Sequence, residues 1–449
     1  MSSVEVSFAE RALARLDAAP RFAVRGRVRR VIGQVVEVSA LDVPVGEVCR
    51  IAPDDRNGIL AQVVGFHERG LLLMPLGEIE GIHPGAMVIP LNRSLHVQAS
   101  ESLIGRVLDG LGRPIDGQGP ILAPARRELA GAVPNPLARR RIHAPLGTGI
   151  RAIDGLISLG RGQRIGIMAG SGVGKSVLLG MIARQTTADV NVIALLGERG
   201  REVREFVERD LGPEGLRRSV VIAATGDQPA VIRATGALVA TAIAEHFRDA
   251  GRDVLLMMDS VTRVAMAWRE IGLSVGEPPA TKGYPPSVFA QLPRLLERAG
   301  PGPDGTITGL YTVLVEGDDF NEPIADAARS ILDGHIVLSR KLAAAKHFPA
   351  IDVLDSVSRV RDHVVDRDHL DAANALLRLE AAYRSAEDLI AVGAYRSGAD
   401  PQVDAAIALR PELLAFLRQE ATEISTFETA RARLHALAAK ITQSAGRAA

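Results

Sequence analysis

The chain has 449 residues, with 53 Lys and Arg against 53 Asp and Glu, and one cysteine, Cys49. A neutral chain lacks the broad basic footprint of a protein held by nucleic-acid backbones, and one cysteine excludes a disulfide framework and a cysteine-based zinc cluster. No apolar run approaches the roughly 18 residues that span a bilayer, and the charges of Glu5, Glu10 and Arg11 exclude a signal-peptide core. We expect a cytoplasmic protein with two to four domains of roughly 150 residues each.

Residues 1–20 form a separate amphipathic segment. Val6, Ala9, Leu13 and Leu16 repeat at helical spacing, and Pro20 ends the pattern. Two interpretations stay open: a short helix packed on the protein, and an arm that binds a partner. We assign the segment to partner binding and leave the partner unnamed.

Residues 21–95 change to a period of two, which is typical of strands. Short runs such as "QVVEVS", "ILAQVVGFH" and "MVIPL" are separated by Gly, Pro and Asp turns, a pattern that predicts a small β-barrel. Five arginines crowd its start: Arg21, Arg25, Arg27, Arg29 and Arg30. Few aromatic residues interleave with them, so a solvated strand face is favoured over a nucleic-acid or lipid patch.

Residues 96–370 have the pattern of an α/β domain. Six short apolar runs, "RIGIM", "DVNVIALL", "SVVIAA", "DVLLMM", "TGLYTVLV" and "HIVLS", alternate with helical segments. Near-continuous apolar strands between helices indicate a parallel sheet that is covered on both faces. Residues 371–449 are helical by period and form a C-terminal helical domain.

The strongest motif is the stretch "RIGIMAGSGVGKSVLLGMIAR", in which a strand, a glycine-rich turn and an apolar helix follow one another. This order is that of a phosphate-binding loop of P-loop ATPases, in which backbone N–H groups and a helix N-terminus hold phosphate oxygens. Lys175 is expected to reach the β- and γ-phosphates, and the Ser176 hydroxyl to ligate Mg²⁺. The predicted nucleotide-binding residues of the loop are Ala169, Gly170, Ser171, Gly172, Val173, Gly174, Lys175, Ser176 and Val177; Ala169 stands where the strict motif has glycine.

Two acidic residues follow other predicted strands. Asp259 ends "DVLLMMD", from where a carboxylate can hold Mg²⁺ through its water shell, although it can equally cap the next helix. Glu198 follows "VNVIALLG" and is expected to face the same crevice as Lys175, where it can orient and deprotonate water. Arg201 and Glu202 fall on the first turn of the next helix, where a surface role is favoured.

Several long blocks resemble one family. "AGSGVGKS", "GERGREV", "MMDSVTRVAMAWREIGLSVGEPPATKGYPPSVFAQLPRLLERAG", "YTVLVEGDDFNEPIADAARSILDGHIVLSRKLA" and "FPAIDVLDSVSRV" are similar to flagellar type III export ATPases. That family is related to injectisome secretion ATPases and to the catalytic subunit of rotary ATP synthases. The resemblance covers residues 22–440 and includes Ala169. It implies a RecA-like ATPase core preceded by a β-barrel and followed by a helical domain.

The resemblance also implies roles for single residues. Glu198 corresponds to the catalytic glutamate, with Arg199 beside it near the phosphates. Ser176 and Asp259 match the magnesium site, and Lys175 matches the phosphate lysine. The remaining implied residues are Arg263, a second arginine near the nucleotide at the subunit boundary; Arg359, an arginine finger for the neighbouring subunit; and Phe348 and Tyr395, which enclose adenine.

The activity implied is hydrolysis of Mg-ATP that energises export of flagellar proteins at the cytoplasmic face of the inner-membrane export apparatus. Because one chain carries both Glu198 and Arg359, we expect a homohexamer. The implied partners are stalk and regulator proteins, export substrates and their chaperones, and no nucleic acid. The loop at 276–286, "GEPPATKGYPP", is expected to face the central pore, and the pair Asp318 and Asp319 to lie near a subunit interface rather than on a second metal.

Three alternatives remain. An injectisome ATPase shares nearly all these motifs, although "GEPPATKGYPPSVFA" favours the flagellar branch. A hexameric RNA translocase needs stacking aromatics and basic pore residues, which the sequence lacks. A non-catalytic rotary subunit has no need of the carboxylate of Glu198.

Overall fold

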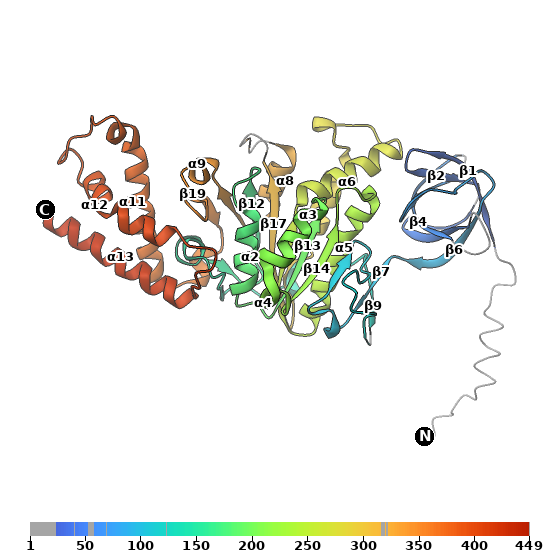
Figure 1. Ribbon diagram of the computed structural model, residues 1–449, viewed down its shortest axis with the longest axis horizontal. Helices are drawn as coiled ribbons and strands as arrows, with labels where there is room; N and C mark the ends of the chain where they lie inside the picture. Colours follow the sequence, from blue (N-terminus) through green and yellow to red (C-terminus); the bar gives the residue numbers. More distant parts are fainter. Residues whose placement is uncertain are drawn as a thin grey trace, which may run out of the picture. The chain divides into compact units, whose positions relative to one another are not determined.

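The computed structural model describes residues 24–448 except 40, 53–57, 69, 123, 316–318, 320 and 321, with side chains described as far as residue 441. The chain divides into two compact units, Met1–Ser94 and Leu95–Ala449 (Figure 1). The predicted helical segment 1–20, Arg21 and Asp318 lie outside the described residues.

The first unit is a closed six-stranded barrel, which confirms the β-barrel prediction. Its strands follow the order β1-β2-β5-β4-β3-β6. Along β1, Gly26 and Val28 are buried while Arg27, Arg29 and Arg30 are exposed, so the arginines lie on the solvent face as predicted. The strands are β1 (Gly26–Ile32), β2 (Val35–Val38), β3 (Glu47–Ala52), β4 (Ile59–His67), β5 (Gly70–Pro75) and β6 (Met87–Ser94).

The second unit is built on a large, mostly parallel sheet, as predicted. Its order is β19-β18-β12-β17-β15-β13-β14-β8, and only β19 and the short β16 run antiparallel to their neighbours. Three strands of this sheet were not predicted: β8 has three residues, β16 has two, and β19 carries polar residues on an edge. The bounds are β8 (Val107–Asp109), β12 (Arg164–Ala169), β13 (Val190–Leu196), β14 (Ser219–Ala224), β15 (Asp253–Asp259), β16 (Gly300–Pro301), β17 (Thr306–Leu314), β18 (Gly334–Leu338) and β19 (Ile351–Ser358).

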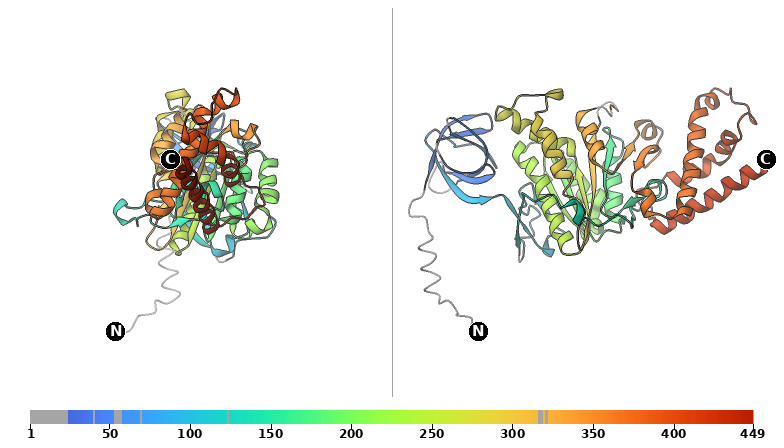
Figure 2. Two further views of the ribbon diagram at one scale, coloured as in Figure 1. Left: turned by 90° about the vertical axis from the view of Figure 1, so that its left-hand side faces the viewer. Right: turned by 180° about the vertical axis from the view of Figure 1, so that it is seen from behind.

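Helices cover both faces of this sheet (Figures 1 and 2). Because side chains alternate along a strand, Val192 and Ala194 of β13 enter one core, whereas Ile193 and Leu195 enter the other. The first core includes α5 (Ala230–Asp249), α6 (Val261–Ser274), α7 (Pro286–Leu296) and α8 (Pro323–Ile331). The second includes α2 (Lys175–Gln185) and the π-helical turn Phe206–Leu211, which lies between α3 (Gly200–Glu205) and α4 (Gly212–Leu216).

Among the described residues, helix α5 is the one helix long and apolar enough to cross a membrane, although it contains no uninterrupted apolar run of that length. Its 20 residues meet the length and composition of a membrane span, but 83% of the apolar window is buried inside the protein. Arg233 and Glu245 interrupt the apolar stretch of α5, while the average hydropathy of the helix remains high. Its burial under β13 and β15 identifies it as a core helix.

Three helices, α11 (Arg367–Ala391), α12 (Pro401–Leu417) and α13 (Phe427–Ala448), form the predicted helical region at the C-terminus. Arg151 fixes it to the α/β core: this buried guanidinium donates to the carbonyls of Phe416 and Arg418 and pairs with Glu423. The amide of Gln419 donates to the carbonyl of Gly149 at 2.8 Å. Helical region and core therefore share buried polar contacts.

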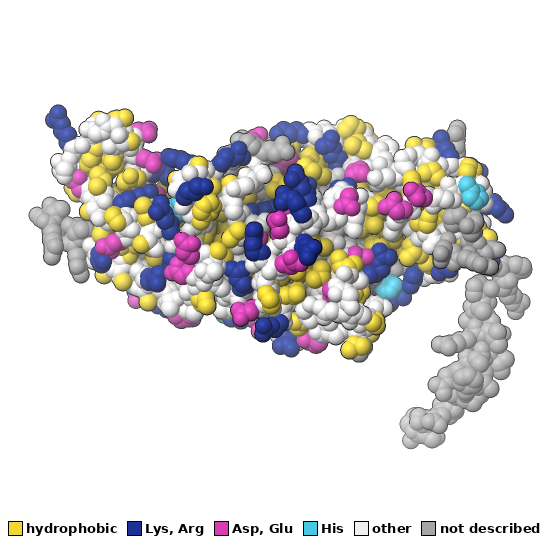
Figure 3. Space-filling model, in the orientation of Figure 1, with side chains coloured by type: hydrophobic (Ala, Val, Ile, Leu, Met, Phe, Trp, Pro, Cys, Tyr) yellow, Lys and Arg dark blue, Asp and Glu magenta, His cyan; other side chains and the backbone are white. Residues whose placement is uncertain are grey.

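Short elements complete the second unit. They are β7 (His96–Ala99), β9 (Ala125–Glu128), β10 (Pro145–Leu146), β11 (Leu159–Gly160), α9 (Arg340–Ala344) and α10 (Arg361–Val364), with a π-helical turn at Ile153–Ile157 and single 3₁₀ turns at Glu101–Leu103, Pro136–Ala138 and Thr281–Gly283. On the face shown in Figure 3, basic and acidic side chains are interspersed, as expected for a chain of zero net charge.

Candidate active site

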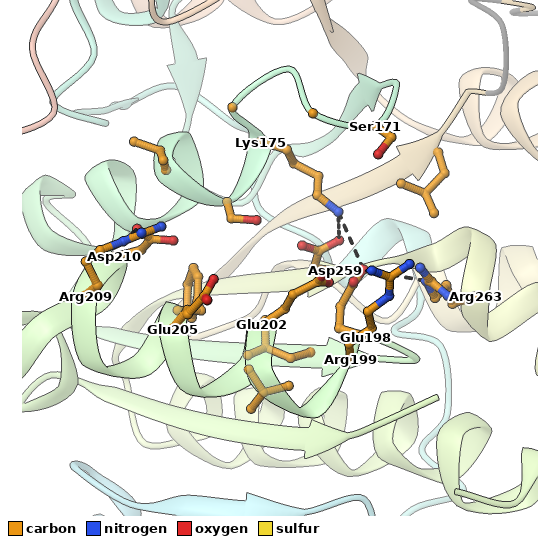
Figure 4. A pocket seen from close by; sticks show the side chains of 18 of the residues that line it. Ser171, Lys175, Glu198, Arg199, Glu202, Glu205, Arg209, Asp210, Asp259 and Arg263 are labelled. Carbon is orange, nitrogen blue, oxygen red and sulfur yellow. Dashed lines mark hydrogen bonds and ion pairs between the residues drawn. The ribbon is translucent and has the colours of Figure 1, made fainter. Parts of the chain in front are cut away.

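A cavity of about 470 Å³ opens at the carboxyl ends of the parallel strands. Its floor is the turn between β12 and α2, which contributes Gly170, Ser171, Gly172 and Gly174 (Figure 4). Gly174 has φ +87° and directly precedes the first residue of α2, so this backbone requires glycine and aims the helix N-terminus into the cavity. The predicted phosphate loop thus has the geometry of an anion site.

The other predicted loop residues divide into two groups. Lys175, Ser176 and Val177 line the cavity. Ala169 and Val173 are buried in the core beneath it, where Ala169 is the last residue of β12 and pairs with Leu314 of β17. Their side chains support the loop, so any contact they make with a nucleotide is through the backbone.

Lys175 and Asp259 form the centre of the site. Lys175 Nζ lies 2.5 Å from Asp259 Oδ1, and Asp259 ends β15 as the sequence predicted. The hydroxyl of Thr312, on neighbouring β17, donates to the same carboxylate oxygen at 2.8 Å. The side chain of Asp259 is only 4% exposed, and these two donors offset the cost of burying its charge.

Glu198 lies at the same edge of the sheet. It follows β13 after Gly197, and its Oε1 is 3.7 Å from Lys175 Nζ and 3.6 Å from Arg263 Nε. Burial raises the pKa of Glu198; the positive charge of Lys175 opposes this rise and the negative charge of Asp259 adds to it. A carboxylate with a raised pKa is a better proton acceptor, which suits the predicted role in activating water.

Gly197 makes the approach of Arg263 possible. Its φ is +75°, and a Cβ there would lie 2.5 Å from Arg263 Cδ. The stem of Arg263 therefore crosses the backbone of Gly197 and brings the guanidinium to Glu198. Arg199 also lines the cavity, but its side chain is 76% exposed and its partner is Glu202, at 3.8 Å.

The opposite wall of the cavity shows what the sequence interpretation missed. Arg201 is exposed and pairs with Glu205, as expected for a surface residue, but Glu202 lines the cavity. Glu202 pairs with Arg201 and Arg199 at the surface and also borders the cavity, so its surface role stays a prediction. The helical face that begins with Glu202 continues along the wall with Glu205, Phe206, Arg209 and Asp210. Their spacing was visible in the sequence, but no motif connected it to the phosphate loop.

The two predicted adenine contacts differ in position. The ring of Phe348 is next to the phosphate loop, 3.4 Å from where a Cβ on Gly174 would lie, and it is 41% exposed. Tyr395 does not line this cavity. Its hydroxyl instead donates to the carbonyl of Asp400 and to Asp404 at the start of α12. This chain therefore brings Phe348, and not Tyr395, to its own phosphate loop.

Arg359 also lies away from the cavity of its own chain. It follows β19, its backbone N–H donates to the carbonyl of Asp333 at 2.9 Å, and its side chain is exposed. A contribution to catalysis from this position requires a second copy of the chain.

The fit of a magnesium ion depends on the donors that the cavity offers. Ser176 and Asp259 supply a hydroxyl and a carboxylate, which are oxygen ligands of the kind Mg²⁺ takes. Among the described residues no group of three or more His, Cys, Asp or Glu side chains can hold a metal. This set fits an ion that is bound by one or two protein oxygens together with substrate phosphates and water.

Three family models match the chain in order. The β-barrel domain of the ATP synthase alpha/beta family matches residues 28–92, its nucleotide-binding domain matches 149–358, and the EscN type III secretion ATPase C-terminal domain matches 365–436. The fold and site therefore define an ATPase of the ATP synthase alpha/beta family.

Comparison with similar proteins assigns the chain to a narrower family within this class of ATPases. The chain is 54% identical to the flagellum-specific ATP synthase of Bacillus subtilis (92% of this chain, 94% of the relative), and 52% identical to the type 3 secretion system ATPase of Xanthomonas euvesicatoria (93% and 94%). It matches the assembled ATPase EscN of enteropathogenic E. coli, solved with its central stalk EscO, at 44% identity and a TM-score of 0.85 (92% and 100%). The chain belongs to the type III secretion ATPases, the family that includes the flagellum-specific ATP synthases.

Proposed function

We propose that this protein hydrolyses Mg-ATP as a homohexameric ring and energises the export of flagellar proteins. The observation that carries the proposal is the convergence of Lys175, Asp259 and Glu198 on one cavity at the carboxyl ends of three strands. A phosphate loop alone explains nucleotide binding. A half-buried carboxylate within 3.7 Å of the loop lysine adds a base for water attack on the γ-phosphorus.

The roles of the residues follow from their positions. The loop backbone and Lys175 bind the β- and γ-phosphates, which requires Lys175 to exchange Asp259 for phosphate oxygens. Ser176 and Asp259 would hold the magnesium ion, which supplies positive charge for the phosphates. Glu198 orients water and accepts its proton, and Arg263 fixes the carboxylate of Glu198 through the 3.6 Å contact. Arg199 extends from the rim toward the phosphates, and Phe348 stacks on adenine.

Arg359 supports the ring. It is exposed and remote from its own cavity, as expected for an arginine finger that acts on the neighbouring subunit. Such a residue contributes about 10³ to 10⁵ in rate, or roughly 4 to 7 kcal/mol of barrier. Monomers should therefore hydrolyse ATP slowly, and turnover should rise with protein concentration. Tyr395 remains a candidate adenine contact only in such an assembly, through conformations that release it from Asp404.

The flagellar assignment rests on the resemblance of residues 276–290 to the flagellar branch and on relatives that carry that name. The exposed loop from 278 to 282 is suited to meet a stalk protein, and the similar ATPase EscN was solved in complex with its central stalk EscO. Further proposed partners are regulators, chaperones and unfolded export substrates, at the cytoplasmic face of the inner membrane. The injectisome alternative is supported by the type 3 secretion system ATPase of Xanthomonas euvesicatoria, which is 52% identical. Deleting the gene distinguishes them: loss of flagellin export supports our proposal, and loss of effector secretion with intact motility supports the alternative.

The hydrolytic role is tested by Glu198→Gln, which preserves shape and removes the base. We expect ATP binding within about twofold of the unchanged protein and a loss of turnover of at least about a hundredfold. The matched control is Glu205→Gln, because Glu205 lines the same cavity but pairs with Arg201 on the helix surface. Undiminished turnover in Glu198→Gln refutes the role, and stimulation of the unchanged protein by RNA would favour the translocase alternative.

A further inference from the structure

The edge strand β19 contains a large bulge shortly before Arg359. His335 of β18 pairs with Val357, and Val337 pairs with Asp352, so Ile336 alone lies opposite Val353 to Ser356. A bulge bends a strand and redirects the residues after it. The bulge thus holds three residues more than a regular ladder has, and whatever fixes it sets the direction in which β19 enters its last pairs, His335 with Val357 and Gly334 with Ser358, just before Arg359.

Asp352 and Ser356 hold the bulge from within. Asp352 Oδ1 accepts the backbone N–H groups of Leu354 at 3.1 Å and Asp355 at 3.2 Å. The hydroxyl of Ser356 donates to the carbonyl of Asp352 at 2.5 Å and accepts the N–H of Val337 at 3.0 Å. Asp352 is thus the residue on which the shape of the bulge depends.

Arg384 of α11 holds Asp352 from outside the sheet. Arg384 Nη2 donates to the same Oδ1 at 2.8 Å, and Nη1 lies 3.9 Å from the carboxylate of Asp355. The hydrogen bond to Asp352 keeps the pKa of Arg384 above its usual value although burial lowers it. The guanidinium therefore binds both acidic residues of the bulge.

The contact continues into the helical region. One turn before Arg384, Glu380 pairs with Arg410 of α12, and the Arg410 guanidinium lies 4.0 Å from the ring centroid of Tyr383. A displacement of α11 against the sheet consequently moves a charge that is bonded to the bulge. Arg384, Asp352 and Asp355 have no role in the predictions from the sequence or in the proposed function.

We infer that Arg384 is a positioning residue for Arg359: through Asp352 it fixes the bulge of β19 and so the direction in which the strand presents the arginine finger. The inference rests on the proposed role of Arg359 in the neighbouring site. It adds that the helical region controls the finger through one ion pair, while nucleotide binding in the cavity of the same chain is independent of that pair.

The test compares steady-state ATP hydrolysis by full-length variants at ring-forming concentrations. For Arg384→Ala we expect kcat to fall about tenfold to a hundredfold, since misplacing a catalytic group by about 1 Å costs that much, with affinity for a fluorescent ATP analogue within about twofold. The control is Arg378→Ala, an exposed arginine on the same helix, which should leave kcat unchanged. Arg384→Lys keeps the charge and should recover part of the loss.

The double variant separates positioning from general stability. If Arg384 acts through Arg359, adding Arg384→Ala to Arg359→Ala causes no further loss, whereas independent effects multiply. An equal loss in both backgrounds, or an Arg384→Ala variant as active as Arg378→Ala, overturns the inference. An Arg359→Ala variant of full activity instead refutes the proposed finger, which makes the two failures distinguishable.

A second variant covers the case in which Arg384→Ala does not fold. Asp352→Asn keeps an oxygen acceptor for the amides of Leu354 and Asp355 but weakens the bond to Arg384. It should lower kcat in the same direction, without a further loss in the Arg359→Ala background. Full activity of a folded Asp352→Asn protein contradicts the inference.

Discussion

The hydroxyl of Thr312 gives the sharpest prediction, because it contacts Asp259 from a strand in which no functional residue was predicted from the sequence. It donates to Asp259 Oδ1 at 2.8 Å, and the residue is fully buried. On the proposed roles, Lys175 exchanges Asp259 for phosphate oxygens, and Thr312 is then the donor that keeps the carboxylate of Asp259 in place. Thr312→Val removes this donor and retains the volume of the side chain.

The size of the effect follows from the charge of the acceptor. A hydrogen bond to an ionised group contributes about 1.5 to 3 kcal/mol, and each 1.36 kcal/mol corresponds to a factor of ten. If the bond supports the catalytic state, kcat falls roughly tenfold to 150-fold, and the magnesium concentration for half-maximal rate rises. Binding of nucleotide without magnesium should change little, because the phosphate loop is untouched.

The assay is ATP hydrolysis with magnesium and ATP varied separately, together with thermal unfolding. Thr241→Val is the matched control: this threonine is 1% exposed, and its hydroxyl donates to the carbonyl of Ala237 within α5, away from the cavity. Both variants should lose similar stability, and only Thr312→Val should lose activity. A Thr312→Val enzyme within twofold of the unchanged protein, or an equal loss in Thr241→Val, refutes the reasoning.

Three further predictions concern acidity, domain attachment and the loop. Burial raises the pKa of Glu198, and its ionised form accepts the proton. We therefore expect kcat/KM to rise with pH, with a midpoint above the pKa of an ordinary glutamate. A pH–rate profile whose midpoint is the pKa of an ordinary glutamate contradicts this expectation. Arg151→Ala leaves buried carbonyls unpaired and should lower the free energy of unfolding by about 3 to 5 kcal/mol. Its control is Arg433→Ala, which removes an exposed ion pair and should lower the free energy of unfolding by less than about 1 kcal/mol. Equal losses in the two variants would show that burial does not matter here. Gly174→Ala and Gly251→Ala introduce similar backbone strain, at φ +87° and +82°. Only Gly174→Ala should weaken ATP binding, by at least about tenfold. Equal ATP affinities of the two variants would show that this loop does not bind the nucleotide.

The parts of the site that the sequence predicted are those that depend on consecutive residues. A phosphate loop is a local motif, and Asp259 and Glu198 directly follow apolar strands, whose carboxyl ends meet at one edge in a parallel sheet. Thr312 lies inside an apolar strand, and its function arises from the pairing of β17 with β15. Pairing between strands 50 residues apart is a tertiary property that periodicity does not contain.

Helix faces and edge strands were predicted less completely for the same reason. Glu202 lies in the first turn of α3, where charged residues both line the cavity and face solvent, so charge did not distinguish the two faces. The bulge of β19 depends on side-chain hydrogen bonds of Asp352 and Ser356, and these polar residues hide the strand from a search for apolar runs. Tyr395 was assigned from the resemblance alone, and in this structure its hydroxyl is bonded to Asp404.

The direction of β19 gives the bulge its significance. The strand pairs antiparallel with β18, with Ile351 opposite Leu338 and Ser358 opposite Gly334. It therefore begins at the carboxyl ends of the parallel strands, just after Phe348, and ends at their amino ends, just before Arg359. On the proposed roles, one strand joins the adenine contact of its own site to the finger for the next site. A straight strand would couple the two ends rigidly, whereas on the inference made above the three extra residues, held by Asp352 and Arg384, let the helical region set their relation.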